Sequence, residues 1–418
     1  MDTRRAFLRS SGLALVSFGL APRVLLRAAA ASDGTARGRR KALVVVLQRG
    51  ACDGLNTVVP WGDPRYFALR PSIAIPRPNG GREAALDLDG FFGLHPALEP
   101  LVPFWKDRRL AVVHALGSPD PTRSHFDAQD FLESGTPGRK ATDDGWLNRG
   151  LQARPESQPA PLRAVAMTPT LPRILAGRAP AVAMASLRDF ALRGGQAPRT
   201  QQGFEQMYAG AVSASLRGAG QETFEALEAL EALDAGGAMG SRAGRRGARG
   251  SASLGQALGQ VAQLVRSDLG LELAFVETGG WDHHAAQGGV QGQLAGRLRD
   301  LAQGLSSFAT ALGPRLDDVV LVTLTEFGRT ARENGNRGTD HGHGSVALVL
   351  GGAVKGGRVH GRWPGLDPGA LYEGRDLAVT TDFRDLVGEL LARHSGITDT
   401  GRVFPGHTPV RFPGVLPG

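Results

Sequence analysis

The sequence predicts an α/β fold: a doubly wound, mostly parallel sheet flanked by helices. Three observations lead to this fold class: short apolar runs of strand length, stretches with helical spacing between them, and polar residues just after the runs. Short buried strands that alternate with amphipathic helices are typical of βαβ units. With 418 residues, the chain is long enough for one large domain with insertions or for two domains.

The predicted strands are short and widely spaced. Residues 42–47 (ALVVVL) form an apolar run that ends at Gln-Arg-Gly, which indicates a buried strand. The same pattern returns at residues 110–116, 272–277, 318–325 and 345–350. The predicted helices complete the βαβ units. Residues 291–312 carry large apolar side chains three or four positions apart, and residues 382–394 repeat this spacing after a helix N-cap at Asp382.

The middle of the chain differs in composition. Residues 221–234 (QETFEALEALEALD) have a strongly helical pattern, whereas residues 235–254 are rich in glycine and arginine and show no apolar periodicity. We therefore expect a helical insertion or cap within residues 150–270, whose helical and flexible part spans about residues 195–258.

The N-terminus resembles a twin-arginine export signal. Arg4 and Arg5 precede a short apolar stretch and an alanine-rich site of the A-x-A kind. The stretch from residue 12 to residue 22 is too short to cross a bilayer. We predict a cleaved signal peptide at residues 1–31, export by the twin-arginine (Tat) translocase to the periplasm or the medium, and no stable membrane span after cleavage. The single cysteine, Cys52, fits a protein that folds without disulfides.

The charge balance argues against nucleic acid as a partner. The net charge is +8, and the first 30 residues contribute +4 of it. No dense stripe of lysine and arginine alternates with aromatic residues. The remaining balance is mild, so no nucleic-acid partner is expected.

Polar side chains gather in the segments that follow four of the predicted strands, and five of the ten histidines lie there. In an open parallel sheet, ligands bind beyond the carboxyl ends of the strands. Imidazole and carboxylate together suit zinc, manganese or iron, so the sequence predicts a metal or anion site at this edge. The candidate residues are Asp53, Ser124, His125, Asp282, His283, His284, Glu326, Arg329, Asp340, His341 and His343.

Residues 338–345 (GTDHGHGS) carry three of these candidates. A polar surface turn is the alternative to a metal-binding loop for such a segment. Gly342 and Gly344 surround the histidines, which makes core packing a poor explanation for them. The other candidate segments favour the metal-binding loop.

Five longer motifs resemble a known bacterial family. They are QRGACDGLNTVVP, GSPDPTRSHFDAQDFLESG, GGWDHH, TEFGRTARENGNRGTDHGHG and GGRVHGRWPGL. Together they resemble the domain-of-unknown-function 1501 family of Tat-exported proteins, over nearly the whole chain from about residue 40. That family is similar, more distantly, to the alkaline phosphatase and sulfatase superfamily. The resemblance implies an alkaline phosphatase-like α/β domain at residues 40–418, with metal ligands at the strand ends.

The same resemblance implies roles for the candidate residues. Two departures from the superfamily pattern affect these roles. Glu326 has no adjacent histidine in place of the usual Asp-His pair, so either Asp340 with His341 replaces that pair or only one ion binds. The sulfatase motif C-x-P-S-R is also absent. The implied metal ligands are Asp53, Asp282, His284 (or His283), Glu326, Asp340, His341 and His343, and the implied nucleophile is Ser124 at a helix start.

These inferences lead to an exported metal-dependent hydrolase of phosphate or sulfate esters. One or two divalent ions, zinc first and manganese, iron, magnesium or calcium as alternatives, would activate Ser124 or a water. Arg329 and Arg123 would clamp a small-molecule or polymer-borne anionic ester, and His125 would be an orienting residue, a ligand or a general acid. Ser124 fits a helix N-cap equally well. The alternatives are a non-catalytic exported binding or assembly protein on the same scaffold, and a phosphotransferase acting on sugars.

Overall fold

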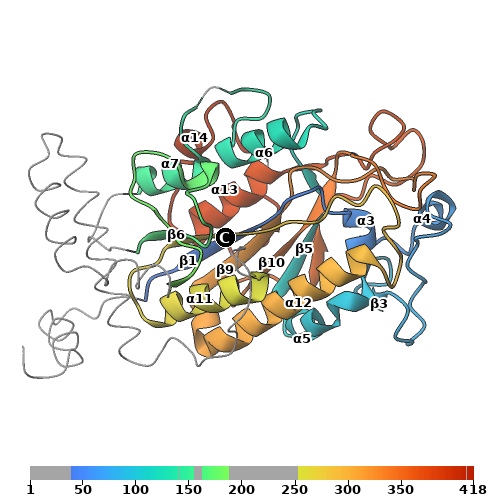
Figure 1. Cartoon of the computed structure of the whole chain (residues 1–418), viewed down its shortest axis with the longest axis horizontal. Helices are drawn as coiled ribbons and strands as arrows, with labels where there is room; N and C mark the ends of the chain where they lie inside the picture. Colours follow the sequence, from blue (N-terminus) through green and yellow to red (C-terminus); the bar gives the residue numbers. More distant parts are fainter. Residues whose placement is uncertain (1–38, 141, 155–161, 188–252, 411) are drawn as a thin grey trace, which may run out of the picture.

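A computed structural model of the chain describes residues 39–140, 142–154, 162–187, 253–410 and 412–418 (Figure 1). Its main sheet has nine strands. The strands are β1 (Ala42–Gln48), β5 (Leu110–Gly117), β6 (Ala164–Ala166), β7 (Val182–Ala183), β8 (Leu273–Thr278), β9 (Val319–Leu324), β10 (Ser345–Gly351), β11 (Arg358–His360) and β12 (Thr381–Asp382). Their order is β11-β5-β10-β9-β1-β8-β6-β7, with β12 also paired to β5.

The sheet is mostly parallel. Only β10 runs against its neighbours, β5 and β9, and the other paired strands of this sheet run in one direction. The five predicted strands correspond to β1, β5, β8, β9 and β10, which confirms the α/β fold class. Their apolar runs are buried because helices cover both faces of the sheet.

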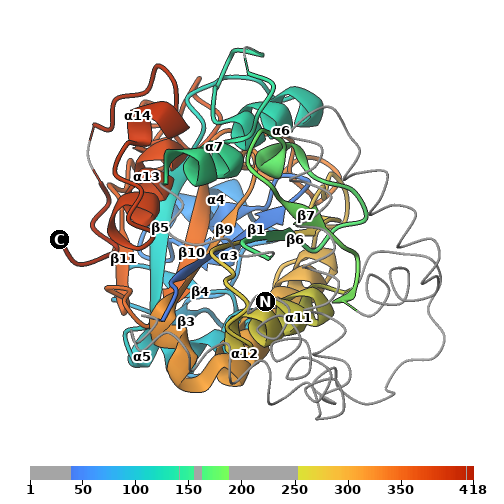
Figure 2. The same ribbon diagram turned by 90° about the vertical axis from the view of Figure 1, so that its left-hand side faces the viewer.

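Helices cover the two faces of the sheet (Figures 1 and 2). One layer contains α5 (Val102–Lys106), α11 (Leu254–Arg266), α12 (Gln293–Leu312) and the 3₁₀ helix η1 (Pro96–Leu101). The other contains α6 (His125–Ser134), α7 (Trp146–Ala153), α13 (Phe383–Arg393) and α14 (Thr400–Val403). Along β1, Val44 and Val46 face the first layer, whereas Leu43, Val45 and Leu47 face the second.

The two helices expected from leucine spacing are present as α12 and α13. Asp382 accepts a hydrogen bond from the Arg384 N–H and caps α13, as its position predicts. The smaller elements are α3 (Gly54–Thr57), α4 (Pro64–Leu69), η2 (Arg173–Leu175), η3 (Gly313–Asp318) and a three-stranded sheet of β2 (Val58–Val59), β3 (Leu86–Asp87) and β4 (Gly93–Leu94).

The region from residue 150 to residue 270 departs from the expected helical cap. Its described part includes β6 and β7, which extend the main sheet beyond β8 by parallel pairing. Runs of two or three residues carry too little periodicity to indicate a strand. Of the expected insertion at residues 195–258, residues 195–252 lie outside the described part of the chain. Residues 253–258 contain the start of α11, where Ser253 forms a capping box with Gln256.

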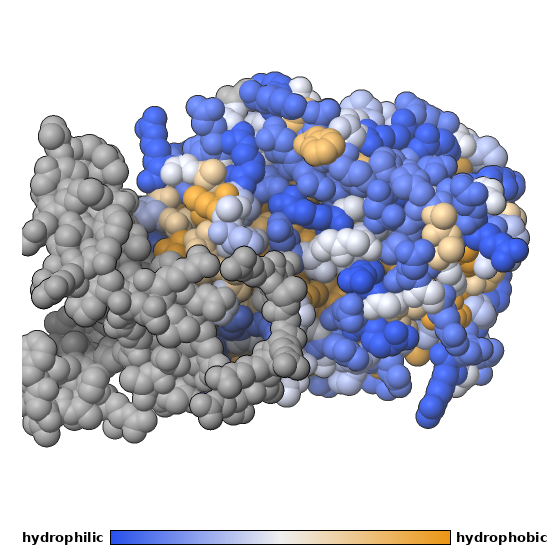
Figure 3. Space-filling model, viewed as in Figure 1, coloured by the Kyte–Doolittle hydropathy of each residue, from blue (hydrophilic) through white to orange (hydrophobic). Residues whose placement is uncertain are grey.

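The predicted signal peptide at residues 1–31 lies outside the described residues. Among the helices that the structure does describe, none has both the length and the apolarity needed to cross a membrane. On the face seen in Figure 1, the described surface is mainly hydrophilic, and hydrophobic residues gather in smaller areas (Figure 3).

The reversed direction of β10 decides where the GTDHGHGS segment lies. The parallel strands β1, β5, β8 and β9 end at one edge of the sheet, and an antiparallel strand begins at that edge. Had β10 been parallel, the loop before it would have lain at the opposite edge. The reversal therefore brings residues 338–344 to the edge where the loops after the other strands meet.

Two buried histidines have a hydrogen-bond partner at each ring nitrogen. In His114, Nδ1 accepts the N–H of Ala115 (2.9 Å), and Nε2–H donates to the Val58 carbonyl (3.0 Å). His95 has the same arrangement, with an N–H at Nδ1 (2.9 Å) and a carbonyl at Nε2 (3.0 Å). Burial, which disfavours the charged ring, lowers the pKa of each histidine from 6.5 to about 4.

We expect the fold to lose stability as the pH falls from about 6.5 to about 4. In this range His95 and His114 bind protons in the unfolded chain but stay neutral in the folded chain. Their contribution to the stability of the fold is therefore complete above about pH 6.5 and is lost as the pH falls to the lowered pKa of about 4. A shift of this size corresponds to roughly 3 kcal/mol per histidine. Urea unfolding at about pH 7 and about pH 5 measures the loss. In the His114→Gln variant the midpoint should depend less on pH, and equal pH dependence in both proteins would contradict the assignment.

Candidate metal centre

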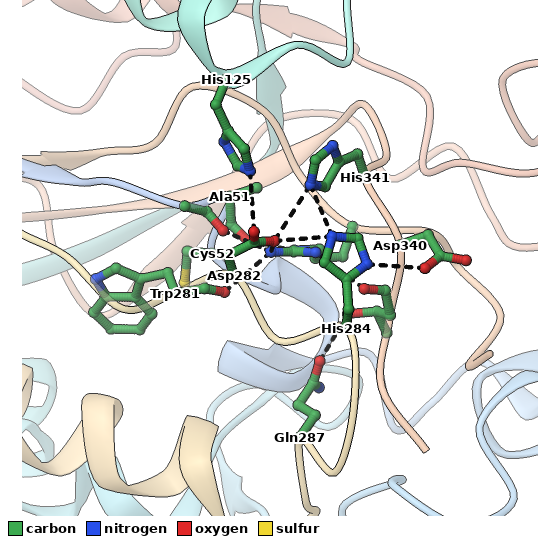
Figure 4. A network of polar contacts seen from close by, with 12 residues as sticks. Ala51, Cys52, His125, Trp281, Asp282, His284, Gln287, Asp340 and His341 are labelled. Atoms are coloured by element: carbon green, nitrogen blue, oxygen red, sulfur yellow. Dashed lines mark hydrogen bonds and ion pairs between the residues drawn. The ribbon is translucent and has the colours of Figure 1, made fainter. Parts of the chain in front are cut away.

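Four side chains from three segments of the chain meet at the carboxyl edge of the sheet (Figure 4). His125 is the first residue of α6, which follows β5. Asp282 and His284 follow β8, and His341 precedes β10. One ligand atom from each of His125, Asp282 and His341 lies within 4.8 Å of the other two. The fourth member, His284, places its Nε2 3.1 Å from Asp282 Oδ1 and 3.0 Å from His341 Nε2.

All three histidines present Nε2 toward Asp282, because each Nδ1 is next to an acceptor. In a neutral ring, an acceptor at Nδ1 favours the tautomer with the hydrogen on that atom and a lone pair on Nε2. For His125, the hydrogen bond to Glu326 also raises the pKa of the ring. The pairs are His125 Nδ1 with Glu326 Oε1 (2.8 Å), His284 Nδ1 with Asp340 Oδ1 (3.0 Å), and His341 Nδ1 with the carbonyl of Arg123 (2.8 Å). Acceptors of this kind behind the ring are typical of metal-binding histidines.

The Nε2 atoms of His284 and His341 face each other at 3.0 Å. With both rings neutral and the hydrogen on Nδ1, two lone pairs repel each other at this point. His125 Nε2 is buried and has no hydrogen-bond partner among the described residues; Asp282 Oδ2 is 3.5 Å away. A cation would remove the repulsion and satisfy His125.

The spacing of these atoms fits one small ion. Ligand atoms at 2.0–2.1 Å from a tetrahedral zinc ion are about 3.3 Å from one another. Asp282 lies 3.5 Å from His125, 3.1 Å from His284 and 3.2 Å from His341, measured between carboxylate oxygen and Nε2. The residues present therefore fit a centre held by His125, Asp282 and His341, with His284 next to Asp282 Oδ1 and His341 Nε2.

Asp282 stays ionised because of its surroundings. Partial burial opposes ionisation, but the hydrogen bond and charge of Arg329, with a further contribution from His284, outweigh it and lower the pKa of Asp282 to about 2. The Arg329 Nη2 atom lies 2.5 Å from Asp282 Oδ1. The Asp282 side chain is 43% exposed and that of His284 is 45% exposed, so the centre can be reached from solvent.

Arg329 does not have the clamp role that the sequence suggested. Its side chain is fully buried, and its N–H groups donate to four main-chain carbonyls as well as to Asp282. These carbonyls belong to Gly50, Ala51, Trp281 and Thr339. Arg329 therefore ties the loops after β1, β8 and β9 together and orients Asp282, with no donor facing an incoming ester.

Glu326 and Asp340, both predicted as ligands, lie one layer behind the centre. Glu326 is buried, and besides His125 it accepts hydrogen bonds from the Gly50 N–H, the Gln129 amide and the Thr325 hydroxyl. The bond from His125 and those from its other donors outweigh burial and hold the pKa of Glu326 below its usual range. In the structure these two acids contact the Nδ1 atoms of His125 and His284 and orient those rings, rather than facing Asp282.

Asp53 lies in a buried network beside the centre. Its Oδ2 accepts from Arg70 Nη1 (2.6 Å) and from the Gln287 amide (2.7 Å). Arg70 also donates to Asn56, and Gln287 also accepts from Thr339. Burial opposes ionisation of Asp53, but Arg70 lowers its pKa on balance. The positive charge of Arg70 compensates the negative charge of Asp53. Asp53 does not lie among His125, Asp282, His284 and His341.

The remaining candidates also lie outside the group. The ring of His343 is buried and stacks on Tyr372, with centroids 4.3 Å apart. The hydroxyl of Ser124 accepts from the Asp127 N–H (3.5 Å) and caps α6, which is the alternative that its position allowed. His283 is buried, so His284 is the histidine of this pair that joins the centre.

Two groups that orient the ligands are absent from the sequence prediction. Gln129 reaches Glu326 from one helical turn beyond His125, and this i, i+4 spacing is a usable signal. The main-chain carbonyl of Arg123 orients His341, and a carbonyl leaves no trace in the side-chain pattern.

A comparison with known families agrees with the motif resemblance. No curated protein matches the chain. The family described as "Protein of unknown function (DUF1501)" matches residues 110–406, which is well over half of the chain and includes all four residues of the centre. The chain therefore belongs to the DUF1501 family.

Proposed function

We propose that this protein is an exported, metal-dependent hydrolase of phosphate or sulfate esters. The observation that carries the proposal is the convergence of three imidazole Nε2 atoms on one carboxylate, each ring being fixed from behind by an acceptor. The covered faces of the parallel sheet and the position of the site support an alkaline phosphatase-like fold for the same domain.

We propose zinc as the ion and one ion per chain. Imidazole and carboxylate ligands together suit zinc, whereas magnesium and calcium take oxygen ligands almost exclusively. Glu326 is engaged by hydrogen bonds, and Asp53 Oδ2 is engaged by Arg70 and Gln287. The proposed ligand set is His125, Asp282 and His341, which leaves the fourth position of a tetrahedral ion for water, and His284 lies beside Asp282 and His341.

The chemistry of such a centre is hydrolytic. The ion supplies Lewis acidity, which lowers the pKa of a water and polarises a phosphoryl or sulfuryl oxygen. The chain holds Asp282 ionised through Arg329 and places an acceptor at the Nδ1 atom of each histidine, which favours a lone pair on Nε2 in the neutral ring. The capping role of Ser124 favours water over serine as the nucleophile. Exposure of Asp282 and His284 allows a small or polymer-borne anionic ester to approach.

The purified chain, cleaved after the signal peptide, is expected to carry one zinc ion and to hydrolyse an aryl phosphate or aryl sulfate. Elemental analysis gives the metal content, and release of the phenol gives the turnover. A chelator should abolish turnover, and added zinc should restore it. A chain that binds no divalent ion at micromolar concentration would refute the proposed centre.

A second candidate function is a non-catalytic, exported binding or assembly protein. Two observations favour it: the Arg329 side chain is fully buried among carbonyls and Asp282, and Ser124 serves as a cap. This alternative predicts bound zinc with no turnover of any ester. Export rests on residues 1–31, and fusing them to a reporter that is active only after Tat transport tests it.

A further inference from the structure

We propose that Asp376 is a positioning residue for His341, because its carboxylate holds the two arginines that contact this histidine. The inference rests on the proposed metal centre and adds to it the group that sets the geometry of one ligand. Asp376 lies in the segment between β11 and β12, more than 30 positions after His341, and no motif in the sequence marks it.

The carboxylate of Asp376 is fully buried and paired on both oxygens. Oδ2 accepts from Arg123 Nη2 (2.7 Å) and Nε (3.2 Å), and Oδ1 accepts from Arg375 Nε (2.9 Å). A buried carboxylate with these charge-assisted bonds fixes both guanidinium groups in place.

Each of these arginines also contacts His341. The carbonyl of Arg123 accepts from His341 Nδ1 (2.8 Å), and Arg375 Nη2 donates to the carbonyl of His341. His341 is therefore held at its ring and at its main chain by two residues whose side chains converge on Asp376. This arrangement fixes the direction in which His341 Nε2 points.

The backbone around Asp376 makes this support rigid. Main-chain hydrogen bonds run in both directions between Tyr372 and Asp376 (2.8 and 3.0 Å) and close a tight turn. Glu373 adopts a positive φ of 52° inside that turn. The ring of Tyr372 stacks on His343, two residues beyond His341, so the turn is packed against the segment that carries the ligand.

Loss of the Asp376 charge should loosen His341 without removing any ligand. The two guanidinium groups would then share a buried site without their common counter-charge, and Arg123 with its carbonyl would shift. Glu373 does not replace Asp376, because it bonds to Arg123 alone (2.6 Å) and is 54% exposed. Removal of such an outer partner lowers metal affinity roughly 10–100-fold in known sites.

The experiment compares zinc affinity in the full chain and two variants by competition with a chelator. Asp376→Asn is expected to lower the affinity roughly 10–100-fold. Glu373→Gln, which also removes a carboxylate from Arg123, is the matched control and should leave the affinity within about 2-fold. Cobalt replaces zinc in a second set of samples, where the visible absorption spectrum reports the ligand geometry. The spectrum should change in Asp376→Asn and stay unchanged in Glu373→Gln.

A third variant keeps the test decisive if Asp376→Asn does not fold. Arg375→Gln alters a half-exposed side chain, leaves the Asp376–Arg123 pair in place and removes the contact with the His341 carbonyl. It should weaken zinc binding and change the cobalt spectrum in the same direction. Wild-type affinity and spectrum in the folded variants would overturn the positioning role alone. A wild-type chain that binds neither zinc nor cobalt would overturn the proposed centre, and this inference with it.

Discussion

Replacing Asp282 with asparagine is expected to lower zinc affinity by at least about 100-fold, since removal of an outer partner alone costs 10–100-fold. Asp282 is the only carboxylate of the four-residue group and is the member that all three imidazoles approach. Asparagine has nearly the same shape and can still accept from Arg329, so the change mainly removes the negative charge. Zinc titration against a chelator measures the affinity, and turnover of an aryl ester should fall with it.

Two further variants define the specificity of this effect. Asp340→Asn alters the acceptor behind His284 and should lower the affinity less, by roughly 10–100-fold. Asp127 lies two residues after His125 and pairs with Lys140 at the surface. Asp127→Asn should therefore leave the zinc affinity unchanged. Unchanged metal content in Asp282→Asn would show that the ligand assignment is wrong.

Replacing Arg70 with methionine is expected to lower the free energy of unfolding by about 3–5 kcal/mol. Arg70 and Asp53 form a buried ion pair at 2.6 Å, with neither side chain more than 2% exposed. Removing one partner leaves an uncompensated charge in the interior, because Gln287 alone then contacts Asp53 Oδ2. Arg70 also donates to the carbonyls of Thr330 and Ala331, which become unpaired as well.

Urea unfolding of Arg70→Met, followed by far-UV circular dichroism, measures this loss. The matched control is Arg65→Met, which breaks the exposed pair of Arg65 with Asp367 and should cost less than about 1 kcal/mol. A cost for Arg70→Met no larger than that of the control would show that the buried pair contributes little. The double variant Arg70→Met with Asp53→Leu should recover part of the loss, because it removes both charges.

The fold class could be predicted because five strands of the sheet are continuous apolar runs. β1 and β9 are buried along their whole length, which leaves a clear trace in the sequence. β6 and β7 leave no such trace, since they are three and two residues long and owe their structure to pairing with β8 and with each other. The direction of β10 could not be predicted either, because apolar runs do not distinguish parallel from antiparallel pairing.

The candidate site could be predicted as a region but not as a set of ligands. Carboxylates and histidines after successive strands identify the edge of the sheet where His125, Asp282 and His341 converge, since strand ends meet there. The sequence does not distinguish Asp282, which faces the histidines, from Glu326, which accepts hydrogen bonds behind one of them. That difference depends on side-chain direction and on partners far away along the chain, such as His125, which lies 201 positions before Glu326.

The reversal of β10 has a consequence for how this scaffold can vary. β9 and β10 are neighbours, so the residues between Leu324 and Ser345 form a hairpin connection that leaves and re-enters the sheet at one edge. Such a connection can lengthen at little entropic cost, about 0.6 kcal/mol for each doubling, and no crossing of the sheet needs to be rebuilt. We expect relatives to differ in length between Glu326 and His341, and grafting a longer connection onto the present chain would change the surface beside the site while preserving the strands.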